Sequence, residues 1–101
     1  MLDDDATIRH TVSFRLRPEA DEDAFLARLA ALADIDGVED FQLLRDVGDK
    51  NDFSHGATMV FADRAAYDAY NDHADHQAFV ADVWMRDVED FLEVDHQRLG
   101  G

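Results

Sequence analysis

Three histidines, each in a different segment, are spaced so that they lie on the same side as the apolar residues of that segment. His10 and His55 lie in two segments of alternating pattern, and His76 begins an apolar stripe at helical spacing. An unpaired buried imidazole is costly, so each needs a partner or a function. A local hydrogen bond in a small core is the simpler interpretation of any one of them. Taken as a set, with His73 three residues before His76, they favour a shared pocket.

Tyr70 and His76 together suggest acid–base catalysis. A histidine in the first turn of a helix feels the positive end of the helix dipole, which disfavours the imidazolium and leaves a neutral general base. A nearby tyrosine hydroxyl can donate to a developing enolate or alkoxide. The pair therefore suits proton abstraction next to a carbonyl, as in an aldol-type cyclisation. Spacing alone is a weak signal, because many chains have a tyrosine near some histidine.

Residues 72–76, Asp-His-Ala-Asp-His, offer a competing metal-site interpretation. Imidazoles at i and i+3 beside carboxylates are usable ligands for zinc or manganese. A site needs three or four converging ligands and only two are evident, so we expect no metal. Residues 46–52 hold calcium-like side chains but lack the EF-hand order, which indicates a solvated loop. No cofactor-binding motif is evident, and we expect no cofactor.

Composition narrows the class of protein. The chain has 101 residues, a formal net charge of −15 and no cysteine. This length fits one domain, and the charge disfavours nucleic acid and anionic membranes as partners. The absence of cysteine excludes disulfides, a thiolate zinc site and a thiol nucleophile. Alanine supplies 15 of the apolar residues, so large core side chains are few and shared burial in an oligomer would help.

The acidity has a particular composition. Aspartate occurs 19 times and glutamate 5 times, while arginine occurs 8 times and Lys50 is the single lysine. Short carboxylates carry charge with little apolar stem, whereas lysine stems become costly where salt strengthens the hydrophobic effect. The pattern resembles cytoplasmic proteins of salt-loving organisms, in which molar salt screens such a charge. The alternative is an ordinary acidic protein.

Two elements are expected in the first third of the chain. Residues 7–17 alternate between apolar and polar side chains, which predicts a strand with one buried face. Pro18 cannot continue a sheet ladder and ends this strand. Acidic residues then precede an apolar stripe at helical spacing, which predicts a helix that ends near Asp34, with Gly37 in the following turn.

The rest of the chain predicts two strands, two helices and a last strand. Strands are expected at 38–47 and 54–62, and the last at 88–96. The strand at 38–47 places three apolar residues on one face: Phe41, Leu43 and Val47. Asp63 and Asp72 are expected as N-caps of the two helices.

The resulting order, β-α-β-β-α-α-β, predicts an α+β domain with an antiparallel sheet and helices on one face. We assign residues 7–97 to this domain and expect flexible ends at 1–6 and 98–101. The second sheet face needs another surface to cover it. The acidic N-terminus is unlike a signal peptide and no apolar run could span a membrane, so we expect a soluble, cytoplasmic protein.

Several segments resemble the stress-responsive A/B barrel (Dabb) family over about residues 8–96. They are IRHTVSFRL at 8–16, Gly37-Val38, SHGATMVF at 54–61, YDAYNDHADH at 67–76 and VEDFLEVD at 88–95. The resemblance implies a ferredoxin-like fold and a homodimer in which sheet packs against sheet as an α+β barrel. Such a barrel would cover the second sheet face and remove exposed edges.

The same resemblance implies a site. In a plant branch that performs a cofactor-free aldol condensation as a polyketide cyclase, the catalytic tyrosine and histidine match Tyr70 and His76. Pocket histidines of that branch match three further residues: His10, His55 and His73. This chain departs from the family at Ala74, where proline is usual between the two histidines, and at His96, where an aromatic residue is common.

Two functions remain open from the sequence. The broad family favours a homodimer that binds a small apolar molecule or acts in stress response. The alternative is a polyketide-cyclase-like enzyme with His76 as general base and Tyr70 as proton donor. An open cavity shared by these two side chains would favour the enzyme.

Overall fold

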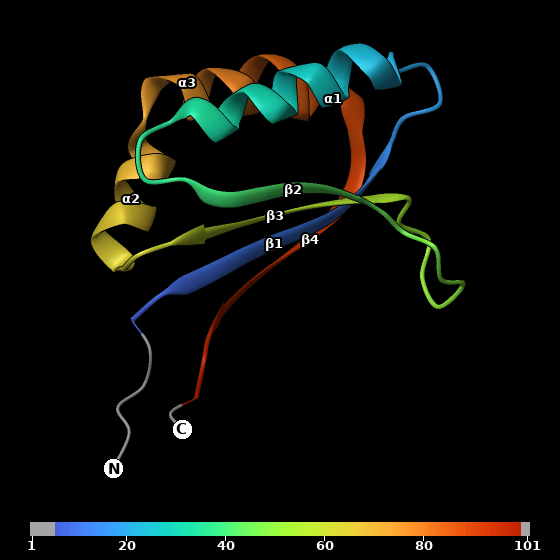
Figure 1. Ribbon diagram of the computed structural model, residues 1–101. Coiled ribbons are helices and arrows are strands. Elements are labelled where there is room, and N and C mark those ends of the chain that lie inside the picture. Colours follow the sequence, from blue (N-terminus) through green and yellow to red (C-terminus); the bar gives the residue numbers. More distant parts are fainter. Residues whose placement is uncertain (1–5, 100–101) are drawn as a thin grey trace.

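The computed structural model describes residues 6–99 and contains one antiparallel sheet of four strands (Figure 1). Residues 1–5, 100 and 101, which fall in the expected flexible ends, lie outside the described residues. The spatial order is β2-β3-β1-β4. The strands are β1 (Ile8–Leu16), β2 (Glu39–Arg45), β3 (His55–Phe61) and β4 (Val88–Gln97).

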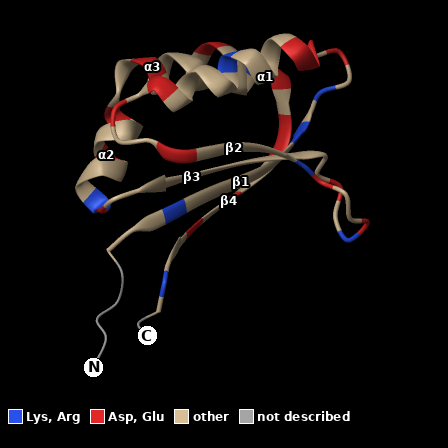
Figure 2. Ribbon diagram, in the orientation of Figure 1, with Lys and Arg blue, Asp and Glu red and all other residues tan. Residues whose placement is uncertain are grey.

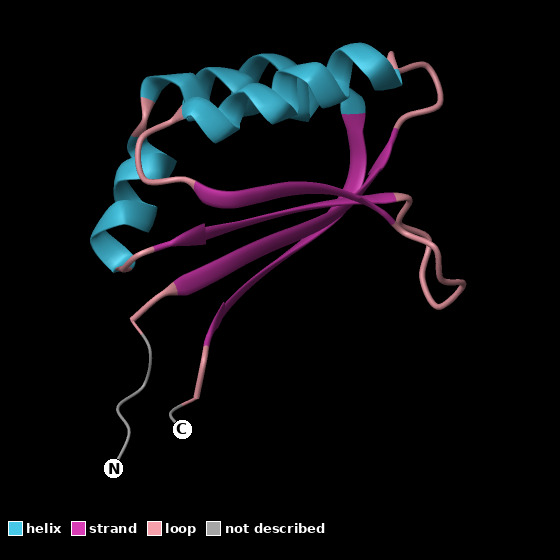
Figure 3. Ribbon diagram, in the orientation of Figure 1, coloured by secondary structure: helices cyan, strands magenta, loops and turns pink. Residues whose placement is uncertain are grey.

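Helices cover one face of this sheet (Figure 3). They are α1 (Glu22–Ala30) with the 3-10 turn η1 (Ala31–Asp34), α2 (Arg64–Asp72), α3 (Ala74–Phe79), the π-helical segment η2 (Val80–Trp84) and α4 (Met85–Asp87). The ferredoxin-like α+β fold expected from the sequence is therefore confirmed. Within the described residues, no helix combines the length and apolar character needed to cross a membrane.

The first helix forms where its caps and apolar spacing place it. Asp21 is the N-cap, and its carboxylate accepts a hydrogen bond of 3.0 Å from the Ala24 backbone N–H. Phe25 and Leu29, one turn apart, are buried against the sheet. Gly37 follows at a φ of +93°, a left-handed conformation that glycine adopts without strain, and it turns the chain into β2.

Alternation in the two central strands sets the core. On β3, four residues of alternating position face the helices and are buried: His55, Ala57, Met59 and Phe61. On β1, every second residue from Ile8 to Phe14 lies opposite one of these four residues and faces the helices as well. Aromatic side chains from both layers fill the space between sheet and helices.

The other sheet face is uncovered by any described element. Thr11 and Ser13 of β1 point away from the helices, and their cross-strand partners on β4 are Val94 and Leu92. These two apolar side chains are 36% and 54% exposed, and Leu44 of β2 is 42% exposed. Exposed apolar side chains on an uncovered sheet face are a common feature of interaction surfaces.

Two expectations about local structure are wrong. Val47 lies beyond the end of β2 and is 91% exposed, because β2 pairs with β3 only as far as Arg45 and the chain then enters a loop. Asp72 is the last residue of α2 rather than an N-cap. The N-cap of α3 is His73, whose Nδ1 accepts a hydrogen bond of 3.0 Å from the Asp75 backbone N–H.

Candidate functional site

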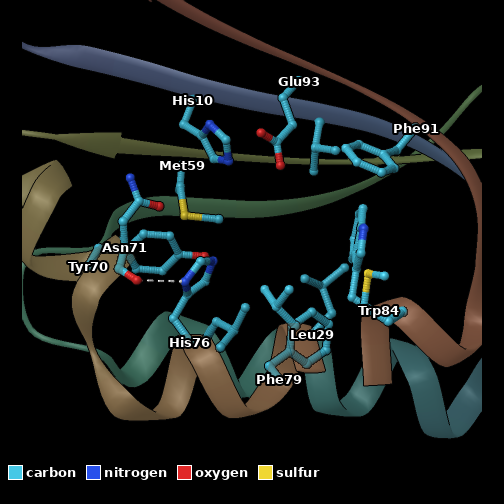
Figure 4. A pocket seen from close by; sticks show the side chains of 14 residues that line it. His10, Leu29, Met59, Tyr70, Asn71, His76, Phe79, Trp84, Phe91 and Glu93 are labelled. Atoms are coloured by element: carbon cyan, nitrogen blue, oxygen red, sulfur yellow. Dashed lines mark hydrogen bonds between the residues drawn. The ribbon is translucent and has the colours of Figure 1, made fainter. Parts of the chain in front are cut away.

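A cavity of about 300 Å³ lies between the sheet and the helices (Figure 4). Its walls come from β1, β3 and β4 on one side and from every helical segment on the other. Most of the lining is apolar or aromatic, and the polar groups are few: His10, Tyr70, Asn71, His76 and Glu93. A small-molecule site commonly has this composition, an apolar cleft with a few polar groups that fix orientation.

The break between α2 and α3 brings Tyr70 and His76 together. Asp63 caps α2, and its carboxylate accepts a hydrogen bond of 2.8 Å from the Ala66 backbone N–H. The helix ends at Asp72, and the next residue, His73, has extended backbone angles and turns the chain into α3. Tyr70 and His76 then face one another across this turn, with ring centroids 4.4 Å apart, and both point into the cavity.

His76 is arranged as a neutral base. Its Nδ1 donates a hydrogen bond of 3.2 Å to the Asn71 carbonyl oxygen, which can only accept. The proton of the neutral ring therefore resides on Nδ1, and Nε2 keeps its lone pair for the cavity. Burial lowers the pKa of His76, and the Asn71 carbonyl offsets part of this effect. The first-turn position expected from the sequence is found, but burial is the largest cause of the lowered pKa.

Tyr70 is arranged as a donor. The side chain is 2% exposed, and burial raises the pKa of its hydroxyl, so the phenol stays protonated. Its hydroxyl has no hydrogen-bond partner within residues 6–99. Every inaccessible side-chain polar atom in that range has a partner, so the unpaired hydroxyl oxygen must be accessible although the rest of the side chain is buried. The hydroxyl is therefore open to the cavity that Tyr70 lines. It can donate to an oxygen of a bound molecule.

His10 joins them from the sheet as part of a network that the sequence did not predict. Its Nδ1 lies 2.6 Å from Asp95 Oδ1, and the Tyr67 hydroxyl donates a 2.9 Å hydrogen bond to Asp95 Oδ2. The same hydroxyl lies 3.1 Å from His10 Nδ1. Because a carboxylate accepts, Nδ1 of His10 carries a proton. Burial, followed by the hydrogen bond to Asp95, raises the pKa of Tyr67.

Sequence reasoning also did not predict several other residues at the cavity. Phe91, Glu93 and Asp95 alternate along β4 and so share the face toward the helices, a period-two signal that the sequence does contain. Trp84 and Met85 enter the lining at the end of the π-helical segment. Such segments are frequent at functional sites, but no local sequence pattern marks this one.

Two of the expected pocket histidines lie elsewhere. His55 shares the face of Met59, but four residues along an extended strand separate them by about 13 Å. Its Nε2 contacts Glu22 Oε1 at 2.7 Å and its Nδ1 contacts Ser54 Oγ at 2.7 Å, while its ring stacks on Phe14. These contacts anchor the start of β3 to α1. Neither His55 nor the capping His73 is part of the cavity lining.

The Asp-His-Ala-Asp-His segment does not gather its side chains. His73 points along its own helix end to the Asp75 backbone, whereas His76 faces the cavity. Across residues 6–99, no group of three or more His, Cys, Asp or Glu side chains is placed to hold a metal ion.

Comparisons with known proteins agree with this fold. The sequence profile of the Stress responsive A/B Barrel Domain (Dabb) family matches residues 8–97. A Dabb family protein with a ferredoxin-like fold from Mesorhizobium loti has 47% identity and a TM-score of 0.88, over 93% of this chain and 98% of that chain. A search of curated proteins found no match.

More distant structures share the fold. A hydroxynitrile lyase from Passiflora edulis has a TM-score of 0.84 at 17% identity, over 94% of this chain and 95% of that chain. A dimeric ferredoxin-like protein of unknown function from Thermobifida fusca has a TM-score of 0.74 at 23% identity, over 91% of each chain.

Proposed function

The chain belongs to the stress responsive A/B barrel domain (Dabb) family, and on that premise we propose that it is a homodimer whose cavity binds a small molecule and performs cofactor-free acid–base chemistry on it. The single observation that carries the chemistry is the hydrogen bond from His76 Nδ1 to the Asn71 carbonyl. It leaves Nε2 as a base in an apolar cavity beside a tyrosine hydroxyl that has no other partner among the described residues.

The uncovered sheet face supports the dimer. Its exposed apolar residues lie on β2 and β4, on both sides of the central strands. Burial of such a face against a second copy supplies apolar area that a chain rich in alanine lacks. Structures of the same fold are described as dimeric, which agrees with this assembly.

The proposed reaction is proton abstraction next to a carbonyl. Tyr70 O–H donates to the carbonyl oxygen, and His76 Nε2 takes the proton from the neighbouring carbon, which leaves an enolate and an imidazolium. In an aldol-type step the enolate carbon forms a bond to a second carbonyl carbon, and that oxygen takes the proton back from His76. The Asn71 carbonyl steadies the imidazolium, because it accepts from Nδ1 throughout.

Deuterium exchange tests this chemistry without knowledge of the natural substrate. The probe is 4-phenyl-2-butanone in D₂O with about 1 M KCl, and NMR follows loss of its α-hydrogens. We expect exchange above the buffer rate, and a loss of about 10²-fold or more in His76→Gln, as is usual for a general base.

The control is His73→Asn, which replaces a histidine outside the cavity lining and keeps an N-cap residue. It should exchange like the wild type. A probe that binds but exchanges at the buffer rate would leave a binding protein and reject the enzyme. Equal losses in both histidine variants would reject His76 as the base.

A further inference from the structure

Glu93 places a carboxylate in the cavity that nothing in the protein neutralises. It lies on β4 opposite Val12, and its side chain points into the cavity beside His10 (Figure 4). Within residues 6–99 it forms neither an ion pair nor a hydrogen bond, and the lining contains no lysine or arginine. The carboxylate is therefore free to meet a ligand.

The cavity keeps a net negative charge in either state of His10. With His10 neutral, the carboxylate of Glu93 in the cavity lining is uncompensated, while Asp95 lies outside the lining and accepts hydrogen bonds from His10 and Tyr67. With His10 protonated, it compensates only Asp95, its partner at 2.6 Å. Among the other lining groups only His76 could carry a positive charge, and burial lowers its pKa.

Four aromatic side chains line the same cavity as this carboxylate: Tyr70, Phe79, Trp84 and Phe91. Trp84 and Phe91 meet edge to face with centroids 5.4 Å apart, and Phe91 lies two residues before Glu93 on β4, on the same face of the sheet. A cation within about 6 Å of such rings is attracted by their negative faces. A carboxylate with aromatic walls is a suitable environment for an ammonium group.

We propose that Glu93 sets the ligand class of this cavity: it takes a molecule with an apolar body and a protonated amine, and it rejects one with a carboxylate. This inference rests on the proposed small-molecule function and specifies its ligand. Glu93 is exposed, so molar salt screens part of the attraction that an amine gains in contact with it, at a distance close to the Debye length of about 3 Å at 1 M, but does not remove it. A carboxylate ligand meets repulsion at the same place.

Three probes of one skeleton test it: 2-phenylethylamine, 2-phenylethanol and phenylacetate. Binding is measured by NMR titration in about 1 M KCl, on the wild type, on Glu93→Gln and on Glu39→Gln. The last variant removes one exposed charge outside the cavity lining and is the matched control. We expect the amine to bind the wild type at least about tenfold more tightly than phenylacetate, with the alcohol between them.

In Glu93→Gln this preference should fall to about twofold or less, through weaker amine binding and stronger phenylacetate binding. Glu39→Gln should keep the wild-type order. Equal affinities of amine and phenylacetate for the wild type, or an unchanged preference in Glu93→Gln, overturn the role of Glu93 while leaving the binding function intact. Failure of all three probes to bind overturns the proposed function and this inference together.

Discussion

Tyr67 and Tyr70 lie almost one helical turn apart on α2, but their hydroxyls have different surroundings. The Tyr67 hydroxyl donates to Asp95, and the Tyr70 hydroxyl opens into the cavity. Tyr67→Phe should therefore lower the free energy of unfolding by about 1 kcal/mol or more, and Tyr70→Phe by less than about 0.5 kcal/mol. Urea denaturation in molar salt measures both. Equal losses would contradict the different roles of the two hydroxyls.

His76 gives stability a defined pH dependence. Its pKa lies below the ordinary 6.5 because the ring is buried, so below that pH the unfolded chain binds more protons than the folded one. Its contribution is complete above pH 6.5 and is lost as the pH falls toward the lowered value. Urea denaturation across this range should show a smaller decline in His76→Gln than in the wild type. Parallel profiles would show that burial of the imidazole has no such effect.

For single residues, sequence reasoning could identify which face of a strand a side chain occupies, but not whether its position along the strand brings it to the cavity. Period two correctly predicted that His10 and His55 point inward. It could not show that His55 lies toward the far end of β3 from the cavity, since that depends on which strands pair and in which register. Glu93 was missed although it alternates with Phe91 and Asp95, because a charged residue on an edge strand is ordinarily a solvated one.

Among the elements, α2 positions the chemistry and begins at Asp63. Asp63→Ala removes the hydrogen bond to the Ala66 N–H and should cost about 1 kcal/mol of stability. Asp68→Ala is the matched control, since it removes an exposed carboxylate in the middle of the same helix. Thermal denaturation in molar salt compares them, and equal melting temperatures would contradict the capping role.

The helices and strands differ in how far the sequence can predict them. Caps and apolar spacing were sufficient for α1 and α2, because the signals lie within each helix. The π-helical segment at Val80–Trp84 has no such signal, and it sets where Trp84 and Met85 enter the lining. Exposure of β2 was also beyond prediction, because alternation does not distinguish an edge strand from a central one.

For the whole molecule, the open sheet face and the charge act together. Acidic residues are spread over helices, loops and strands rather than gathered at one site (Figure 2). Two chains of net charge −15 repel one another, so we expect the proposed dimer through the open face to require screening salt. The sequence predicted this need for a second surface from the number of strands alone, but only the register shows that Leu92 and Val94 form part of it.

Leu92→Lys tests the dimer, with Val47→Lys as its control. Both replace an exposed apolar residue and change the charge equally, but Leu92 lies on the open sheet face and Val47 in a loop. Sedimentation in about 1 M KCl should show dimers for the wild type and Val47→Lys and monomers for Leu92→Lys; at about 10 mM salt the wild type should also dissociate. Dimers in all three proteins at both salt concentrations would contradict this interface.

The most direct measurement is the tautomer of His76, read from its two ring nitrogens by ¹⁵N NMR at neutral pH with and without 4-phenyl-2-butanone. We predict a neutral ring with the proton on Nδ1, and a shift of the Nε2 resonance when the ketone binds. A ring protonated on Nε2, an imidazolium, or an Nε2 resonance unchanged at saturating ketone would contradict the role of His76 as the base of this cavity.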